Sequence, residues 1–333
     1  MSRIVFTCGD INGIGPEIAI KALNKISKQN NKNPLILLIP ENVFKAVSKR
    51  IKPLFKYCFV NKINSKITST DQVHIFTIGS FKQRIGIPTI TSGKASFLAL
   101  KTSFKLLKNE IADAVVTAPV SKTALKLAGI KYRGQTEIYA DWCGVKKFVM
   151  TFLSKKLRVC LYSIHIPLRE VPKLLNKNEL SSKLDVIIST LQYDLGIRRP
   201  KIAVLGLNPH AGEKGIIGRE ETDIIDQVIK RKQLKESIDG PFSADAFFAN
   251  RRFKDYDIVL GMYHDQVLIP FKYISSGRGV NYTAGLPIVR TSPDHGTAYD
   301  IAGKGIADES SMLEAFRYAE LIVRNRMKSI SAE

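Results

Sequence analysis

Long apolar runs and nucleic-acid-binding motifs are missing from this sequence of 333 residues, and we expect no leader segment. No apolar run approaches the ~20 residues that a membrane-spanning helix needs, so we expect no membrane partner. The N-terminal stretch MSRIVFTCGDING enters a strand-like run directly and lacks the apolar segment of a secretory signal. The expected location is therefore the cytoplasm.

Cysteine is scarce, and the cysteines present are not arranged in pairs. The four residues are far apart in the sequence and form no CxxC motif: Cys8, Cys58, Cys143 and Cys160. This pattern favours free thiols in a reducing compartment over disulfides or a cysteine-based metal site.

Acidic residues are under-represented relative to basic ones. The chain has 51 Lys and Arg against 30 Asp and Glu, a formal net charge of +21. The lysines are scattered, and no Arg-rich arm or basic strand with interleaved aromatics is present. We therefore expect no nucleic-acid partner, and we interpret the charge as solvated surface that attracts anionic ligands.

A short apolar run, a turn and a segment of helical period alternate along the chain, which predicts a mainly parallel α/β architecture. PLILLIP and ADAVVTAPV are typical of buried strands, and KASFLALKTSFKLLKNE is typical of a helix. Ser121 is a predicted N-cap and Gly129 a predicted helix terminator. No linker marks a domain boundary.

The dinucleotide fingerprint GxGxxG is also missing. The first predicted turn, GDINGIGPEI, leads into a helix expected from about Glu17 to Ile26, but it has no acidic residue ~20 positions further on. Its glycines could bring backbone N–H groups close to an anion. Tight packing between strand and helix is the better interpretation.

Histidine is rare, with five residues in the whole chain, yet three of them follow apolar strand-like runs. His165 follows RVCLYSI, His210 follows KIAVLGLNP and His264 follows DIVLGMY. If these runs are parallel neighbours, the three imidazoles meet at one sheet edge and suffice for a catalytic divalent metal. From spacing alone, separate structural or acid–base roles remain open, and Asp265 could be a ligand, a support for a ligand or a turn residue.

Other polar residues suggest ligand contacts. His74 lies in an alternating strand pattern and is expected to be structural. His295, in the glycine-rich SPDHGTAYDIAGKG, could contact a nucleotide. Lys272, Asn281 and Arg290 could clamp a phosphate or carboxylate, although from the residues alone the better interpretation of each is a surface residue.

Taken together, these motifs resemble those of the NAD(P)-dependent 4-hydroxythreonine-4-phosphate dehydrogenases of pyridoxal phosphate biosynthesis. The resemblance extends over nearly the whole chain and rests on GDINGIGPEI, VVTAPVSKTAL, GQTEIYA, LNPHAGEKGIIGREE, GPFSADAFF, YDIVLGMYHDQVLIPFK and GVNYTAGLPIVRTSPDHGTAYDIAGKGIAD. The last motif also resembles a loop of isocitrate and isopropylmalate dehydrogenases, whose fold the family shares.

The resemblance implies a two-lobed α/β/α architecture rather than a Rossmann fold. The first lobe would comprise residues 1–130 with 270–333 and the second residues 131–269, with the active site in the cleft between them. It also implies a homodimer in which each metal site is assembled from both subunits, with His165 reaching the partner's site.

The resemblance further assigns roles to individual residues. It implies a divalent metal (zinc, magnesium or cobalt) bound by His165, His210 and His264. The implied substrate contacts are Gln135, Thr136, Lys272, Asn281 and Arg290. NAD or NADP would lie against the loop that contains His295, Gly296 and Asp300, and Asp245 and Asp265 are the candidate proton acceptors.

The implied reaction oxidises 4-phosphooxy-L-threonine to 2-amino-3-oxo-4-phosphooxybutanoate, which decarboxylates to 3-amino-2-oxopropyl phosphate. One position departs from the family, which usually has His where this chain has Gln135. Glutamine can form hydrogen bonds but cannot carry charge or transfer a proton near neutral pH. This departure leaves open a related substrate such as 4-phosphothreonate. A metal-dependent phosphoester hydrolase is a more distant alternative.

Overall fold

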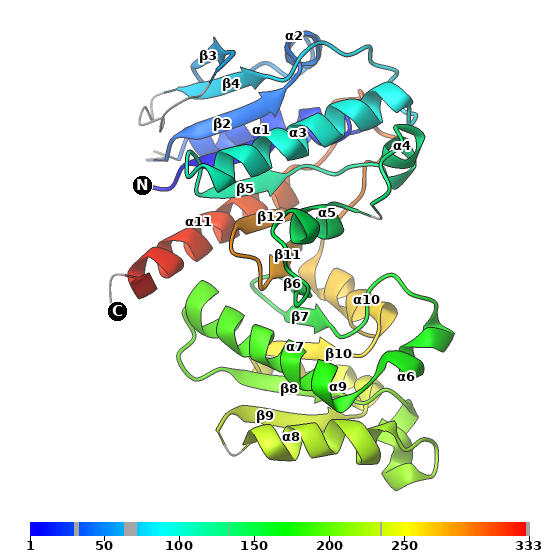
Figure 1. Ribbon diagram of the computed structural model, residues 1–333. Coiled ribbons are helices and arrows are strands. Elements are labelled where there is room, and N and C mark those ends of the chain that lie inside the picture. The colour runs from blue at the N-terminus through cyan, green and yellow to red at the C-terminus, as the bar shows by residue number, and fades with distance from the viewer. Residues whose placement is uncertain (30–32, 63–71, 133, 234, 331–333) are drawn as a thin grey trace. The chain divides into compact units, whose positions relative to one another are not determined.

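The computed structural model describes residues 1–29, 33–62, 72–132, 134–233 and 235–330 (Figure 1). The chain divides into two compact units. Unit 1 comprises Met1–Gly144 and Pro287–Arg324, and unit 2 comprises Val145–Leu286 and Asn325–Glu333. The corresponding boundaries implied by the resemblance lie near residues 130 and 270. In the described part of the chain, no helix has the length and apolar character needed to cross a bilayer.

Unit 1 contains a parallel sheet with the strand order β3-β4-β2-β1-β5-β12. The strands are β1 (Ile4–Thr7), β2 (Leu35–Ile39), β3 (Tyr57–Val60), β4 (Val73–Thr77), β5 (Ala114–Thr117) and β12 (Val289–Pro293). The central strands β1, β2 and β5 are buried along their whole length, which explains their continuous apolar sequences. His74 lies on β4 and is 8% exposed.

The helices of unit 1 cover both faces of this sheet. They are α1 (Gly15–Ser27), α2 (Glu41–Ser48), α3 (Ile90–Lys108), α4 (Lys122–Leu127), α5 (Gln135–Trp142) and the part of α11 (Ser310–Ile330) up to Arg324. Helix α3 packs on β1, β2 and β5 (Figure 1). On α11, Phe316 stacks on Phe6 of β1 with ring centroids 5.8 Å apart.

Local signals in the sequence are confirmed where helices start and stop. The Ser121 hydroxyl accepts a hydrogen bond from the backbone N–H of Ala124 at 3.1 Å and so caps α4, and Gly129 adopts φ +79° just after it. The first turn packs tightly, as expected. A Cβ on Gly9 would overlap the carbonyl oxygen of Pro119, and a Cβ on Gly15 would overlap that of Cys8.

Unit 2 contains a mixed sheet with the order β11-β6-β7-β10-β8-β9. The strands are β6 (Val149–Leu153), β7 (Arg158–Leu161), β8 (Lys201–Leu205), β9 (Ser237–Phe242), β10 (Ile258–Gly261) and β11 (Val280–Ala284). β6 runs antiparallel to both β11 and β7, whereas the pairs β7–β10, β10–β8 and β8–β9 are parallel.

The helices of unit 2 are α6 (Val171–Leu174), α7 (Lys177–Ser189), α8 (Asp226–Gln233), α9 (Ala244–Ala249) and α10 (His264–Ser275). π-helical turns at Thr190–Asp194 and Glu221–Ile225 adjoin α7 and α8. The core packs α9 and α10 against the strands β6, β7, β8 and β10, and within it the rings of Phe152 and Phe271 lie with their centroids 5.7 Å apart. This core fixes the loops that follow the parallel strands.

Candidate active site

The three histidines of interest all follow neighbouring parallel strands of unit 2. β10 pairs in parallel with β7 on one side and with β8 on the other. His165 follows β7, His210 follows β8 and His264 begins α10 directly after β10. Because the carboxyl ends of parallel strands meet at the same sheet edge, the three segments lie along one edge, as the apolar runs predict.

His165 and His264 form a pair beside a pocket. Their ring centroids are 6.2 Å apart, and both residues line a cavity of about 270 Å³ together with Ser163, Tyr263 and Asp265. Nδ1 of His264 lies 2.7 Å from a carboxylate oxygen of Asp265. This contact fixes the orientation of the imidazole and leaves Nε2 as the nitrogen that can bind a ligand.

His210 lies in a strained loop that a buried carboxylate holds. Residues 210–214 all have positive φ, and His210 itself has φ +51°. Left-handed backbone at non-glycine residues persists only where the surroundings enforce it. Here the Glu221 carboxylate, 2% exposed, accepts hydrogen bonds of 2.7 Å from the backbone N–H groups of Leu207 and Asn208.

Asp245, at the start of α9, is held in its ionised form. Its Oδ1 accepts a hydrogen bond of 2.6 Å from the Ser243 hydroxyl. The pKa of Asp245 is lowered by this bond first, then by the backbone N–H of Ala246, and also by the charge of nearby His210. Over the described ranges, no group of three or more His, Cys, Asp or Glu residues is arranged to hold a metal ion within one chain.

The two remaining predicted residues of unit 2 lie apart from these loops. Lys272 is exposed in the last turn of α10. Asn281 lies on β11 opposite Phe152 of β6. Its Oδ1 is buried, and within the part of the chain that the structure describes it has no hydrogen-bond partner. A buried acceptor without a donor is costly, and a bound ligand would satisfy it.

In unit 1, Arg290 is the centre of a hydrogen-bonded cluster. The residue is 2% exposed on β12, next to β5. Its guanidinium donates to hydroxyl and amide oxygens at 3.0 to 3.3 Å, those of Thr117, Gln135, Thr136 and Ser292. Burial lowers the pKa of Arg290 to about 10, so the group remains cationic at neutral pH. The charge of Glu137 opposes this shift, so the cluster holds a buried guanidinium with a carboxylate nearby.

Gln135 supports this arginine. Its Oε1 accepts from Arg290 at 3.1 Å, and its Nε2 donates to the carbonyl oxygen of Ala118 at 3.0 Å. Both ends of the amide are thus fixed, at the first residue of α5. Thr136, the next residue, is 4% exposed and contacts the same guanidinium.

The loop after β12 contains His295, Gly296 and Asp300. His295 Nδ1 lies 3.1 Å from the carbonyl oxygen of Gly296. The other ring nitrogen, Nε2, is buried and has no hydrogen-bond partner among the described residues. A Cβ on Gly296 would meet nothing within 4 Å, and Asp300 is exposed.

This loop is anchored by a residue that the sequence did not single out. Asp10, fully buried after β1, accepts hydrogen bonds from the Tyr299 hydroxyl at 2.8 Å, the Ser92 hydroxyl at 3.1 Å and the backbone N–H of Asn12 at 2.8 Å. Burial raises the pKa of Asp10, and these three donors oppose the shift. The backbone N–H of Ile14 also donates to the Thr297 carbonyl at 3.0 Å. The glycine-rich first turn thus supports the His295 loop.

Sequence reasoning also missed Glu221 and Gln266. Gln266 joins two of the histidine-bearing segments, since its Oε1 accepts from the backbone N–H of Met262 and its Nε2 donates to the carbonyl oxygen of Gly206, both at 2.7 Å. No local pattern marks either residue, because their role depends on burial and on partners distant in the sequence. For Asp10, the Asp-x-Asn turn in GDINGIGP was the available signal.

Comparison with known proteins identifies the family. The family model "Pyridoxal phosphate biosynthetic protein PdxA" matches residues 30–319. The chain belongs to the PdxA family. A 4-hydroxythreonine-4-phosphate dehydrogenase of Sulfurihydrogenibium sp. is 40% identical over 332 residues, covering 98% of this chain and 100% of the relative.

Comparison with solved structures identifies the fold. The crystal structure of 4-hydroxythreonine-4-phosphate dehydrogenase from Klebsiella pneumoniae matches with a TM-score of 0.83 at 33% identity and covers 97% of this chain and 98% of that one. Isocitrate dehydrogenase from Methylococcus capsulatus matches with a TM-score of 0.52 at 14% identity, covering 99% of this chain and 88% of that one. This PdxA chain therefore has the isocitrate dehydrogenase-like α/β fold that its motifs predicted.

Proposed function

We propose that this PdxA-family chain is a 4-hydroxythreonine-4-phosphate dehydrogenase. It would oxidise 4-phosphooxy-L-threonine to 2-amino-3-oxo-4-phosphooxybutanoate with NAD or NADP, and the product would decarboxylate to 3-amino-2-oxopropyl phosphate. The observation that carries the proposal is the similarity to dehydrogenases of this name over at least 97% of this chain and 98% of the matched chains. We further propose that the enzyme acts in the cytoplasm.

Arg290 is the proposed main contact for the anionic substrate. A buried guanidinium attracts phosphate or carboxylate strongly because no water screens it. Thr136 and Gln135 hold the guanidinium in place and are proposed to contact the substrate as well. The buried Oδ1 of Asn281 would accept a hydrogen bond from the substrate, and exposed Lys272 would add positive charge.

His165 and His264 fit a divalent metal, and His210 is the proposed third ligand. The centroid separation of 6.2 Å lets two imidazoles reach one ion, and Asp265 orients His264 as carboxylates commonly orient metal-bound histidines. When bound there, a zinc, magnesium or cobalt ion would supply a Lewis acid that lowers the pKa of a substrate hydroxyl. Imidazole nitrogens suit zinc and cobalt better than magnesium.

The His295 loop fits a dinucleotide. The buried Nε2 of His295 is available to a ligand, and the space around Gly296 lets a ligand approach the backbone. Asp300, exposed in the same loop, would contact a sugar hydroxyl. These features support NAD or NADP at this loop without a Rossmann fingerprint.

Asp245 and Asp265 are the proposed acceptors of the substrate hydroxyl proton. Asp245 is ionised at neutral pH, as a proton acceptor must be, and its lowered pKa makes it a weak base that releases the proton readily. Asp265 already orients the imidazole of His264 through a contact with its Nδ1. To accept the substrate proton as well, Asp265 would have to keep this contact. This difference favours Asp245.

A homodimer is proposed because exposed apolar residues occur in each histidine-bearing segment of unit 2. Leu168, three residues after His165, is 64% exposed, and Ile216, after His210, is 82% exposed. On α10, Ile269 is 67% exposed and Tyr273 is 87% exposed, four residues apart on one helical face. Apolar groups concentrated around the histidines support an interface at which both subunits contribute to the metal site.

A related substrate, 4-phosphothreonate, is a second candidate because of Gln135. Rates of NAD(P)H formation from the two substrates, measured with the same metal-loaded protein, test the choice. The proposal predicts the higher kcat/KM for 4-phosphooxy-L-threonine. A higher value for 4-phosphothreonate would replace the proposed substrate while keeping the reaction class.

A further inference from the structure

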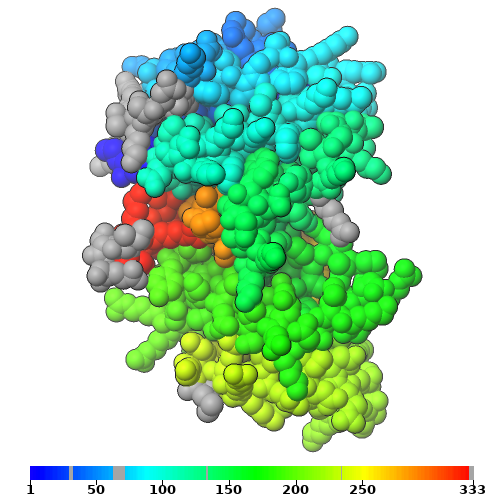
Figure 2. Space-filling view, in the orientation of Figure 1, coloured from blue at the N-terminus to red at the C-terminus, as the bar shows by residue number. Residues whose placement is uncertain are grey.

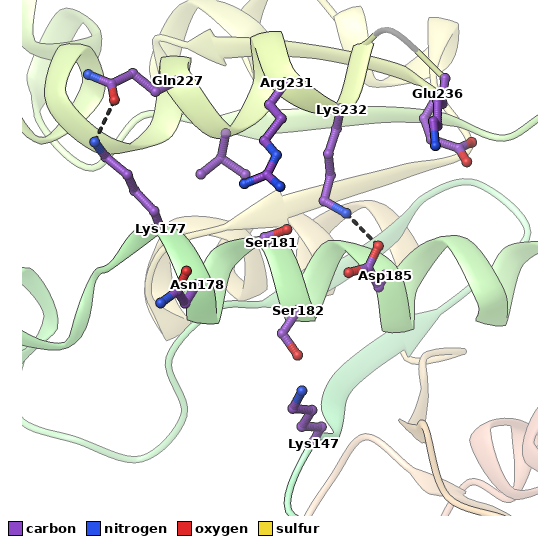
Figure 3. Close-up of a pocket in the computed structure, with 12 residues that line it drawn as sticks. Lys147, Lys177, Asn178, Ser181, Ser182, Asp185, Gln227, Arg231, Lys232 and Glu236 are labelled. Carbon is purple, nitrogen blue, oxygen red and sulfur yellow. Dashed lines mark hydrogen bonds and ion pairs between the residues drawn. The ribbon is translucent and has the colours of Figure 1, made fainter.

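A groove of about 780 Å³ lies between α7 and α8, and none of the residues proposed above for catalysis lines it (Figure 3). Both helices belong to unit 2 and lie on the face of the molecule drawn in Figure 2. The volume is within the range of small-molecule sites. The groove is lined by Lys147, Lys177, Asn178, Ser181, Ser182, Asp185, Gln227, Val228, Arg231, Lys232, Lys235 and Glu236.

The lining is strongly cationic. Five basic side chains face two carboxylates, and one of these carboxylates, Asp185, is already paired with Lys232. Lys177 donates to Oε1 of Gln227 at 2.5 Å, and its charge also lowers the pKa of Asp223, which does not line the groove. Positive charge therefore exceeds negative charge in a concave surface, where the field is focused.

Among the described residues, three of these cations have no side-chain partner. Within the ranges that the structure describes, no hydrogen bond or ion pair is made by the side chains of Lys147, Arg231 or Lys235. Figure 3 shows Arg231 extending from α8 toward Ser181 on α7. A guanidinium fork in this position matches the oxygen pairs of a phosphate group.

The remaining groups also suit phosphate. The hydroxyls of Ser181 and Ser182 and the amide of Asn178 add neutral hydrogen-bond donors along α7. Among the described lining residues, Val228 alone is apolar and none is aromatic. No aromatic ring among the described lining residues is therefore available to stack on a nucleobase, which favours a ligand that is anionic throughout.

We propose that this groove is a second anion-binding site and that its ligand is a small molecule carrying two or more phosphate groups. The inference does not depend on the proposed dehydrogenase activity, because the groove and the histidine loops share no residue. Occupancy would neutralise the repulsion among the lysines of α7 and α8 and hold the two helices together.

The test uses inorganic tripolyphosphate as the probe. Isothermal titration calorimetry should detect its binding to the wild-type chain, and hydrogen exchange should show protection of backbone amides in α7 and α8. In Arg231→Gln the affinity at this site should fall about tenfold or more, and the protection should be lost. Arg231→Lys keeps the charge but loses the two-pronged guanidinium. Its affinity for tripolyphosphate should lie between those of wild type and Arg231→Gln.

Lys230→Gln is the matched control. Lys230 neighbours Arg231 on α8, is 71% exposed, pairs with Asp226 at 2.6 Å and does not line the groove. Its substitution removes the same charge and should leave affinity and protection nearly unchanged. If Arg231→Gln and Lys230→Gln lost equal affinity and protection, tripolyphosphate would be binding only to the overall positive charge of the chain. The proposal would then be wrong.

Two further outcomes would also overturn it. One is the absence of protection in α7 and α8 at saturating tripolyphosphate. The other is tighter binding of a short single-stranded oligonucleotide, with protection in the same helices that Arg231→Gln abolishes. That result would make the groove a nucleic-acid contact instead.

Discussion

Gln135 stands where the resemblance implies a histidine in the family, and in the structure its side chain contacts Arg290. Its amide bridges the buried Arg290 guanidinium and the carbonyl oxygen of Ala118, accepting from one and donating to the other. A neutral histidine can also donate from one ring nitrogen and accept at the other. The substitution therefore preserves hydrogen bonding while removing the ability to carry a proton.

Gln135→Ala should lower kcat/KM for 4-phosphooxy-L-threonine about tenfold or more. Loss of the acceptor leaves a buried N–H of Arg290 without this partner, at a cost of about 1–3 kcal/mol. Gln135→His should retain most of the activity, since it can restore both hydrogen bonds. Steady-state kinetics on the three proteins measures this. An alanine variant as active as wild type would show that Gln135 does not position Arg290.

At the scale of elements, the loops after the parallel strands matter most. Two buried carboxylates, Glu221 and Asp10, hold the His210 loop and the His295 loop respectively. Each binds backbone or hydroxyl donors from segments distant in the sequence. These contacts impose backbone conformations that the loop residues would not adopt by themselves. For His210, that conformation is a positive φ, which non-glycine residues rarely adopt.

Glu221→Ala should weaken divalent-metal binding about 10- to 100-fold, because loss of a supporting residue lets the His210 loop relax. Calorimetric titration of metal-free protein with zinc or cobalt measures the affinity, and thermal melting checks the fold. Asp223→Asn is the control, since Asp223 makes an exposed ion pair with Arg219 that contributes little. Unchanged metal affinity in Glu221→Ala would contradict the positioning role.

Asp10→Asn should change how stability depends on pH. Burial raises the pKa of Asp10 in the folded state, so folding favours its protonated form. The stability that this contributes is present below the unfolded pKa of about 3.9 and is lost as pH rises through the folded pKa. The free energy of unfolding of wild type, minus that of Asp10→Asn, should therefore decrease as pH rises above about 4.

Urea unfolding of both proteins from acid to neutral pH gives this difference directly. Other titrating groups are common to the two proteins and cancel. A difference that is constant with pH, or that increases, would mean that Asp10 does not titrate with a raised pKa.

Much of this arrangement could be predicted from the sequence, and the failures have physical reasons. Continuous apolar runs gave β1, β2 and β5 because buried parallel strands need them. The parallel pairing of β7, β10 and β8 followed from the alternation with helices. The antiparallel β6 and β11 were not foreseen, since a five-residue strand does not encode its direction. Supporting carboxylates such as Glu221 look like surface residues in a sequence.

At the scale of the whole molecule, the proposed homodimer makes a direct prediction. Ile269→Glu places a charge in the apolar face of α10 and should shift the protein from dimer to monomer in sedimentation velocity. Activity should fall in parallel if both subunits complete the metal site. Leu54→Glu, at a residue of unit 1 that is 55% exposed, is the control and should leave the dimer intact. A dimeric and active Ile269→Glu would exclude α10 from the interface.

The most direct measurement is NAD(P)H formation from 4-phosphooxy-L-threonine by the purified protein, before and after chelation and after adding back zinc, cobalt or magnesium. The account predicts turnover that the chelator abolishes and a divalent ion restores, with either NAD or NADP as oxidant. Turnover that persists fully in metal-free protein would contradict the metal assignment to His165, His210 and His264. No turnover by folded, metal-loaded protein would contradict the proposed reaction itself.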